Sequence, residues 1–134
     1  MELKNLITND KVIEVEHPVF DGLFVKLAYV SRETTKKFIE KATVTQFDRK
    51  SREQKESVDN DLFLNMYVPA LLKGWKGFKL EYLQELIPID TSSAEGEELD
   101  YSEQNAIELV KNSVEFDDWI NSIVKDIKNF NKNS

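Results

Sequence analysis

Residues 11–30 read KVIEVEHPVFDGLFVKLAYV, and this stretch decides how the N-terminal part of the chain folds. Ile13 and Val15 alternate with two glutamates, which is the period-two pattern of a strand with one solvent-exposed face. Asp21-Gly22 supplies a turn, and the alternation over 23–30 predicts a second, more buried strand. An antiparallel hairpin of this size is marginal alone, so we expect it to pack on the helices that follow.

The residues after this hairpin predict a helix, an extended segment and a second helix. Ser31 is a good N-cap, and apolar residues at helical spacing continue to about Lys41. Residues 43–47 are β-branched and aromatic, and they are expected to be extended. Ser51 as N-cap with Gln54 three residues later forms the capping-box pattern, from which we expect the second helix to begin.

The second helix has an apolar stripe that widens towards its end, which indicates burial or a partner. Pro69 should kink it, and Gly74 is expected as its left-handed C-terminal residue. The glycine-flanked stretch 75–78 then predicts a tight turn, a hinge between helices. Residues 80–87 predict one or two helical turns, and the polar, acidic stretch 90–100 predicts a mobile loop.

The C-terminal part predicts two further helices. Ser102 caps a helix that ends near Asn112, and Ser113 caps the last one. In the last helix the apolar residues follow the 3.6-residue period as far as Phe130. Acidic residues in its first turn and lysines towards its end match the helix dipole, so this is the most strongly indicated helix of the chain.

Together these patterns predict an α+β fold that is mainly α, with an N-terminal antiparallel β-hairpin packed on a bundle of four or five short helices. A chain of 134 residues is sufficient for a single domain, 1–134. Residues 1–10 and 131–134 have little to bury and are expected to fray.

Composition excludes several classes of function. The formal net charge of −7 opposes binding to nucleic acid and to anionic membranes, and the short stretch 49–52 is the basic exception. Without cysteine, disulfides and thiolate chemistry are excluded. The start of the chain lacks a signal-peptide pattern, and its apolar runs are too short to span a membrane. We therefore expect a soluble, cytoplasmic protein.

The sequence carries no recognisable catalytic or metal-binding motif, so we predict neither enzymatic activity nor a cofactor or metal. His17 is the single histidine, and we expect it to be structural or solvent-exposed. The pairs Asp59/Asp61 and Asp117/Asp118 diverge on helices and are expected to be solvated. The acids from Glu95 to Asp100 lack the regular ligand spacing of a calcium loop.

Large apolar and aromatic side chains on short helices remain as the candidates for function. We predict Met66, Tyr67, Trp75 and Phe78 as partner-binding residues, because aromatic and methionine side chains often supply the binding energy of interfaces. The alternative is that all of them, together with Trp119, are core, since so small a domain needs most of its large side chains inside.

The order of these elements resembles the tail assembly chaperones of long-tailed phages and prophages, and the likeness extends from Leu23 onward. It is carried by residues 47–52 (FDRKSR), the helix over 58–72, the turn 74–78 (GWKGF), residues 99–106 (LDYSEQNA), and the closing helix with Phe116, Trp119, Ile120 and Ile123.

The resemblance implies a mainly helical protein of the host cytoplasm, absent from the mature virion, that binds and shields the tape measure protein before the tail tube polymerises. It leaves open whether the tail tube protein also binds, whether the chain self-associates, and whether a longer frameshifted product exists. Two other functions remain open: a structural tail protein of the completion type, and an acidic DNA mimic that counters restriction or a repressor.

Overall fold

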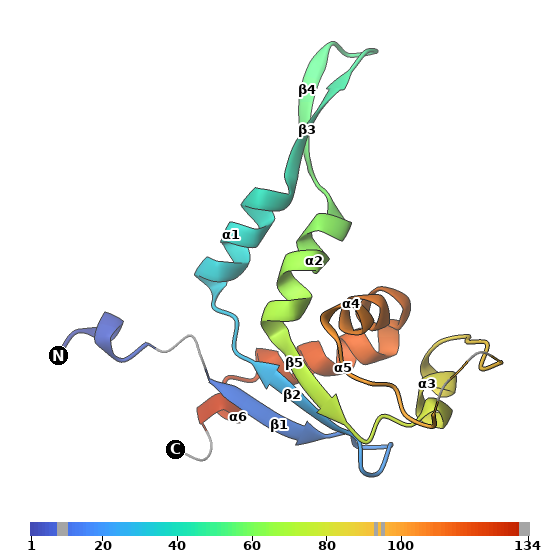
Figure 1. The fold of residues 1–134 in the computed structure, drawn as a ribbon. Helices are drawn as coiled ribbons and strands as arrows, with labels where there is room; N and C mark the ends of the chain where they lie inside the picture. Colours follow the sequence, from blue (N-terminus) through green and yellow to red (C-terminus); the bar gives the residue numbers. More distant parts are fainter. Residues whose placement is uncertain (8–10, 93, 95, 132–134) are drawn as a thin grey trace.

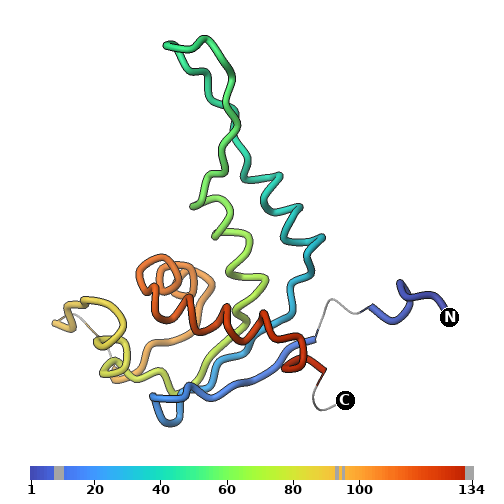
Figure 2. The backbone as a smooth tube through the Cα atoms, turned by 180° about the vertical axis from the view of Figure 1, so that it is seen from behind, coloured from blue at the N-terminus to red at the C-terminus, as the bar shows by residue number. Residues whose placement is uncertain are grey.

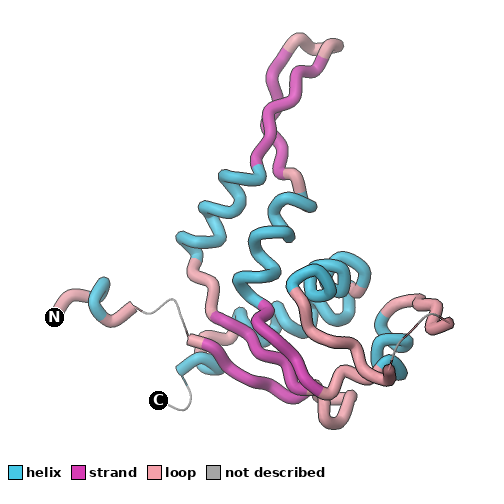
Figure 3. Tube along the Cα trace, viewed as in Figure 1, coloured by secondary structure: helices cyan, strands magenta, loops and turns pink. Residues whose placement is uncertain are grey.

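The computed structural model describes residues 1–7, 11–92, 94 and 96–131. A small antiparallel sheet forms the base, helices cover one of its faces, and a long arm projects away from it (Figures 1 and 3). The α+β fold class and the N-terminal antiparallel hairpin are confirmed. A short 3-10 helix, η1 (Leu3–Asn5), precedes the sheet and is exposed.

The sheet contains the predicted hairpin and one strand that the sequence did not predict. Strands β1 (Val12–Glu16) and β2 (Phe24–Ala28) pair antiparallel with Val15 opposite Val25, as expected. Strand β5 (Leu72–Lys76) pairs with the other edge of β2. The prediction of a helix end at Gly74 and a hinge over 75–78 was therefore wrong. The open edge of β2 and the burial of Leu72 draw this segment into the sheet.

The arm consists of two antiparallel helices continued by a two-stranded ribbon (Figures 1 and 2). Helix α1 (Arg32–Ala42) begins at the predicted cap, where the Ser31 hydroxyl accepts a hydrogen bond from the Thr34 amide. It leads into β3 (Thr43–Asp48), which confirms the extended segment, and β3 pairs with β4 (Glu53–Val58). Helix α2 (Asn60–Leu71) returns to the sheet.

The predicted helix start at Ser51 and Gln54 was wrong. Asp59 caps α2 instead, and its carboxylate accepts hydrogen bonds from the amides of Asp61 and Leu62. Residues 49–52 form the turn of the ribbon, where Arg52 has a φ of +55°. The β-branched strand before this turn offers residues 53–58 a backbone partner, and cross-strand pairing overrides the local capping pattern. Pro69 lies inside α2, as expected.

The C-terminal part contains four helices: α3 (Leu80–Leu86), α4 (Glu103–Asn112), α5 (Val114–Lys125) and α6 (Lys128–Asn131). Helix α4 packs on α2, α5 packs on α4 and β2, α6 contacts β1, and α3 lies beyond the end of the sheet (Figure 1). The Ser102 and Ser113 caps are confirmed. The prediction of one continuous helix as far as Phe130 was wrong. It breaks at Asp126, whose carboxylate accepts a hydrogen bond from the Lys128 amide and starts a new turn.

The core lies between the sheet and the helices. It is built around buried residues in β2, α2, β5, α4 and α5 and next to the two strands, of which the largest are Phe78, Phe116, Leu23, Leu27, Leu71, Leu72, Leu109 and Ile120. Within the loop 90–100, the end near Leu99 is fixed, because the Leu99 amide donates to the Phe78 carbonyl over 2.8 Å. Residues 8–10, 93, 95 and 132–134, to which parts of the predicted mobile loop and frayed ends belong, lie outside the described residues.

Candidate partner-binding surface

Two of the four predicted partner residues, Trp75 and Phe78, lie together at the sheet's edge. The Trp75 indole N–H donates to the Leu99 carbonyl over 2.8 Å, and its ring lies 5.3 Å from that of Phe78 and 5.0 Å from that of Tyr101. Phe78 is 0% exposed, while Trp75 is half-buried. In this conformation Phe78 therefore presents no surface to a partner.

The other two, Met66 and Tyr67, lie half-buried on α2. The Tyr67 ring stacks on Phe63 with 5.1 Å between centroids. Burial, with a smaller contribution from the negative charge of Asp117, raises the pKa of the Tyr67 hydroxyl. Among the ring contacts of the described residues, none joins Tyr67 to Trp75 or Phe78. The structure thus separates the four residues into two pairs.

Tyr67 belongs to an apolar groove at the base of the arm, here called the Tyr29 groove. It consists of two hollows of about 310 and 190 Å³ that share Tyr29 and Val30 in their walls. The remaining lining comes from residues of β1, β2, α1, α2, β5 and α5: Val12, Ala28, Ser31, Thr34, Tyr67, Ala70, Leu71, Lys73, Asn121, Val124 and Lys125. Sequence reasoning found Tyr67 and missed Tyr29 and Val30, because their role depends on how distant segments assemble.

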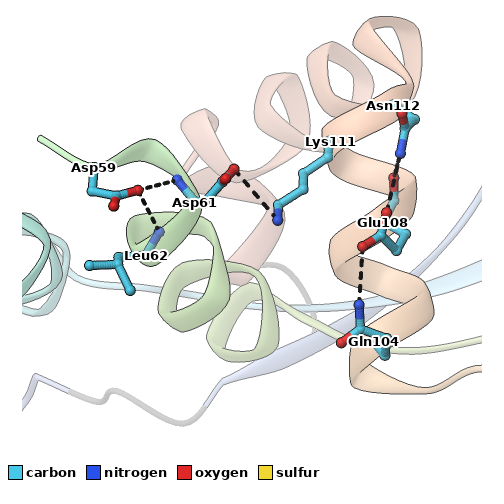
Figure 4. A network of polar contacts seen from close by, with 7 residues as sticks. All are labelled: Asp59, Asp61, Leu62, Gln104, Glu108, Lys111 and Asn112. Carbon is cyan, nitrogen blue, oxygen red and sulfur yellow. Dashed lines mark hydrogen bonds and ion pairs between the residues drawn. The ribbon is translucent and has the colours of Figure 1, made fainter.

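The polar contacts of α4 include one that joins it to α2. The Lys111 ammonium of α4 lies 3.5 Å from the Asp61 carboxylate at the start of α2 (Figure 4). Along α4 itself, Glu108 accepts hydrogen bonds from the side chains of Gln104 and Asn112 (Figure 4). These contacts are at the surface, so each adds little energy, and the first helps to hold α2 against α4.

His17 has a structural environment rather than a catalytic one. Its Nδ1 accepts hydrogen bonds from the amides of Val19 and Phe20 over 3.1 and 3.2 Å. Its ring contacts Phe20 and Trp119, each with 4.5 Å between centroids. Burial lowers the pKa of His17 below the usual 6.5, and the nearby Glu115 partly opposes this. The imidazole closes the β1–β2 turn in its neutral form.

This environment predicts that acid weakens the fold. The folded state holds the pKa of His17 below its unfolded value, so the stabilisation is complete above pH 6.5 and is lost as the pH falls below it. We expect the free energy of unfolding, measured in urea, to fall between about pH 7 and about pH 5. In His17→Asn, whose side-chain oxygen can accept the same amide protons, this pH dependence should be smaller. An unchanged dependence in that variant would contradict the assignment.

The described residues offer no group of three or more His, Asp or Glu arranged to hold a metal ion. A hollow of about 880 Å³ is an open polar cleft between α3 and the loop that follows it, with Lys79, Glu81, Glu97, Glu98 and Asp100 in its wall. Glu81 pairs with Lys79 at 3.8 Å. The described lining of the cleft thus combines an ion pair with exposed carboxylates.

A second surface feature is the arm itself, which exposes large apolar side chains far from the core. Ile39, Phe47, Val58 and Leu62 are 40%, 61%, 49% and 44% exposed. This exposed surface was not predicted, because residues 51–58 were expected to be helical. Residues 53–58 are exposed along their whole length and show no apolar–polar alternation, so the β-branched segment 43–47 was the signal that could have indicated a ribbon.

Comparison with known proteins gives one match. The sequence model of the family described as YdaY prophage protein matches residues 30–134. The chain belongs to the YdaY prophage protein family. The match covers the arm, β5 and the C-terminal helices of this YdaY family chain, and leaves out β1 and β2. The prophage origin implied by the sequence resemblance is thereby confirmed.

Neither the curated proteins nor the solved structures contain a match to this YdaY family chain. Within the described residues, no helix combines the length and the apolar character that crossing a membrane requires.

Proposed function

We propose that this prophage protein is a tail assembly chaperone that binds and shields the tape measure protein before the tail tube polymerises. The supporting observation is the Tyr29 groove, an open apolar surface on an acidic chain, which includes the predicted partner residue Tyr67. The sequence resemblance described above points to the same function. Phe78 is buried against Trp75 and Phe116 and offers no surface to the client in this conformation.

The groove suits one face of an amphipathic helix. Tyr29, Val30 and Ala70 supply apolar walls, and Lys73 and Lys125 supply positive charge for acidic residues of the client. The hollows are small, so each contact is weak and releasable. Many copies along one extended client then provide holding power by avidity, and arriving tube subunits can displace them without nucleotide hydrolysis.

Co-expression with the tape measure protein tests this proposal. The wild-type chain should keep the tape measure protein in the soluble fraction of the cell lysate. Ala70→Glu places a charge in the larger hollow, and a buried charge without a partner opposes apolar docking. We expect this variant to reduce the soluble tape measure protein at least about tenfold, equivalent to about 1.4 kcal/mol of binding.

Val114→Glu is the matched control, because Val114 is 75% exposed and does not line the groove. It should leave the soluble fraction unchanged. The unfolding midpoint of each purified variant shows whether its fold is retained. If Ala70→Glu folds and protects the tape measure protein as well as wild type, the groove is not the client site. If wild type gives no protection, the chaperone function is wrong.

A chaperone acts in the host cytoplasm and is absent from the mature virion, whereas a completion-type protein is incorporated. Mass spectrometry of purified particles separates these two functions. We expect the tube and tape measure proteins to be detected and this chain to be missing. Its presence in stoichiometric amounts would favour the structural alternative.

One observation favours a DNA mimic as the second candidate. Residues 80–126 contain thirteen Asp and Glu against two Lys, whereas the arm, 32–71, contains eight Lys and Arg against seven acids. The carboxylates are thus concentrated in the C-terminal part of the chain, as phosphate mimicry would require. If the chain competes with DNA for a basic DNA-binding protein and does not protect the tape measure protein, this function replaces the chaperone.

A further inference from the structure

The ribbon formed by β3 and β4 has no third strand among the described residues. It extends past the ends of α1 and α2, away from the body, in both views of the chain (Figures 1 and 2). Two-stranded ribbons are marginal alone in water, and an unpaired edge is a template for another strand. The ribbon therefore has two edges at which a partner strand could add.

The two edges differ in chemistry. Strand β4 carries Glu53, Lys55 and Glu56, and charges of this kind protect an edge from pairing. Strand β3 reads Thr-Val-Thr-Gln-Phe before its single charge at Asp48, and that carboxylate already pairs with Lys55 at 3.5 Å. Residues 43–47 are uncharged and rich in β-branched and aromatic side chains, which favour strand pairing. The β3 edge is therefore the unprotected one.

Hydrogen bonding identifies the free groups on this edge. The Asp59 amide donates to the Ala42 carbonyl over 2.8 Å, so Ala42 faces β4. Because antiparallel pairing alternates, the backbone groups of Thr43, Thr45 and Phe47 point away from β4. The Thr43 amide is already bonded to the Glu40 carbonyl at the end of α1. The amides of Thr45 and Phe47 and the carbonyls of all three are therefore available to a partner.

We propose that the β3 edge pairs antiparallel with the β3 edge of a second copy, with Thr45 on the two-fold axis. In this register Thr45 lies opposite Thr45, Thr43 opposite Phe47, and Val44 opposite Gln46. Within residues 43–47 no like charges meet, and pairs of threonine with threonine or with an aromatic ring stabilise sheets. The result is a continuous four-stranded sheet with the strand order β4, β3, β3, β4.

This pairing also covers exposed apolar surface. Phe47, Thr43 and Val58 lie on one face of the ribbon, because Thr43 is directly opposite Val58 and Phe47 is four residues from Thr43. In the dimer, Phe47 of each copy lies beside Thr43 and Val58 of the other, in one row across the strands. The 61% exposed ring of Phe47 thereby gains apolar neighbours.

Charge at the ends of the strands is mixed in this arrangement. Antiparallel pairing brings the basic turn of each ribbon, with Arg49 and Lys50, towards the last turn of α1 in the other copy. That turn contains both Glu40 and Lys41, so attraction to Glu40 and to the partly negative helix C-terminus is offset by Lys41. A second copy therefore complements the edge in backbone bonding and side-chain shape.

A pair of charge variants tests the two-fold position with the purified chain. Wild type should show a reversible, concentration-dependent dimer in sedimentation equilibrium. Thr45→Lys and Thr45→Glu should each be monomeric, because two like charges meet at the axis, while an equimolar mixture should form a heterodimer. A wild-type chain that stays monomeric, variants that remain dimeric, or a mixture that fails to associate would each overturn the proposal.

Cysteine cross-linking supplies a second measurement with a matched control. The chain has no cysteine, so Thr45→Cys and Glu56→Cys each introduce a single thiol. Thr45 and Glu56 face each other across the ribbon, one on each edge. Mild oxidation should cross-link Thr45→Cys into a covalent dimer and leave Glu56→Cys monomeric. Equal or reversed cross-linking would overturn the assignment of the edge.

The dimer does not depend on the chaperone function, because these measurements use the purified chain alone. A chain that is monomeric by itself, and whose Thr45→Lys variant loses tape measure binding, would assign the β3 edge to the client in place of a second copy. In that outcome the dimer fails while the chaperone function stands.

Discussion

Phe78→Ala is expected to lower the free energy of unfolding by about 3–5 kcal/mol, because it removes a fully enclosed ring and leaves a cavity. Phe78 is 0% exposed and lies within ring contact of Trp75 and Phe116. Its carbonyl also accepts the Leu99 amide, which joins the β5 end of the sheet to the loop before α4. Urea unfolding followed by circular dichroism measures the loss.

Phe47→Ala is the matched control, since the same ring is removed from a side chain that is 61% exposed on the ribbon. Its unfolding free energy, measured on dilute protein, should change by less than about 1 kcal/mol. If Phe78→Ala cost no more than Phe47→Ala, the ring would not be part of the core. Its predicted role as a partner-binding residue would then regain support.

Gly77→Ala is expected to lower the free energy of unfolding by at least about 3 kcal/mol, a large share of the stability of a marginally stable domain. Gly77 has a φ of +71°, and a Cβ there would overlap the carbonyl oxygen of Gly22. The obstacle is backbone in the β1–β2 turn, so no side-chain rotation can relieve it. The variant therefore strains the backbone at residue 77, which has a left-handed conformation, and also forces residue 77 away from the β1–β2 turn. Thermal or urea unfolding gives the size of the effect.

Gly22→Ala separates these two contributions. Gly22 has a similar φ of +82°, but a Cβ there meets nothing within 4 Å. This variant should cost only the conformational strain, about 1–2 kcal/mol. If both variants lost the same free energy of unfolding, the close approach of the two turns would contribute nothing to the cost of Gly77→Ala.

The parts of the fold that could be predicted are those encoded locally. Ser31, Ser102 and Ser113 each precede a helix and cap it as expected, because a hydroxyl accepting an amide three residues on is a short-range interaction. The β1–β2 hairpin followed from alternating residues on both sides of a glycine turn. Nothing distant was needed to form either feature.

The errors arose where a distant partner decides the conformation. Ser51 and Gln54 have the residue types of a capping box, yet residues 53–58 pair with β3, and Asp59 caps the helix instead. The segment around Gly74 has helix-ending composition, yet it completes the sheet beside β2. Strand pairing is non-local, and a short sequence window does not contain the strand that will accept it.

The same limit applies to the candidate surface. Tyr67 was predicted from its residue type and position on an apolar helix, and it lines the Tyr29 groove. Val30 was read as the end of a strand, and its place in both hollows depends on α1, α2 and α5 meeting around it. Residue type alone also did not separate Phe78, which is enclosed, from Phe47, which is open to solvent.

The hydrogen bond between Ala42 and Asp59 has a consequence for how this chain can vary. This bond holds the residue before β3 next to the residue after β4, so the ribbon of residues 43–58 projects from a fixed base. Residues inserted in matched pairs near positions 49–52 would lengthen both strands together by roughly 3.3 Å for each pair while the helices below stay in place. The reach of the arm is thus a property that can change independently of the body that carries it.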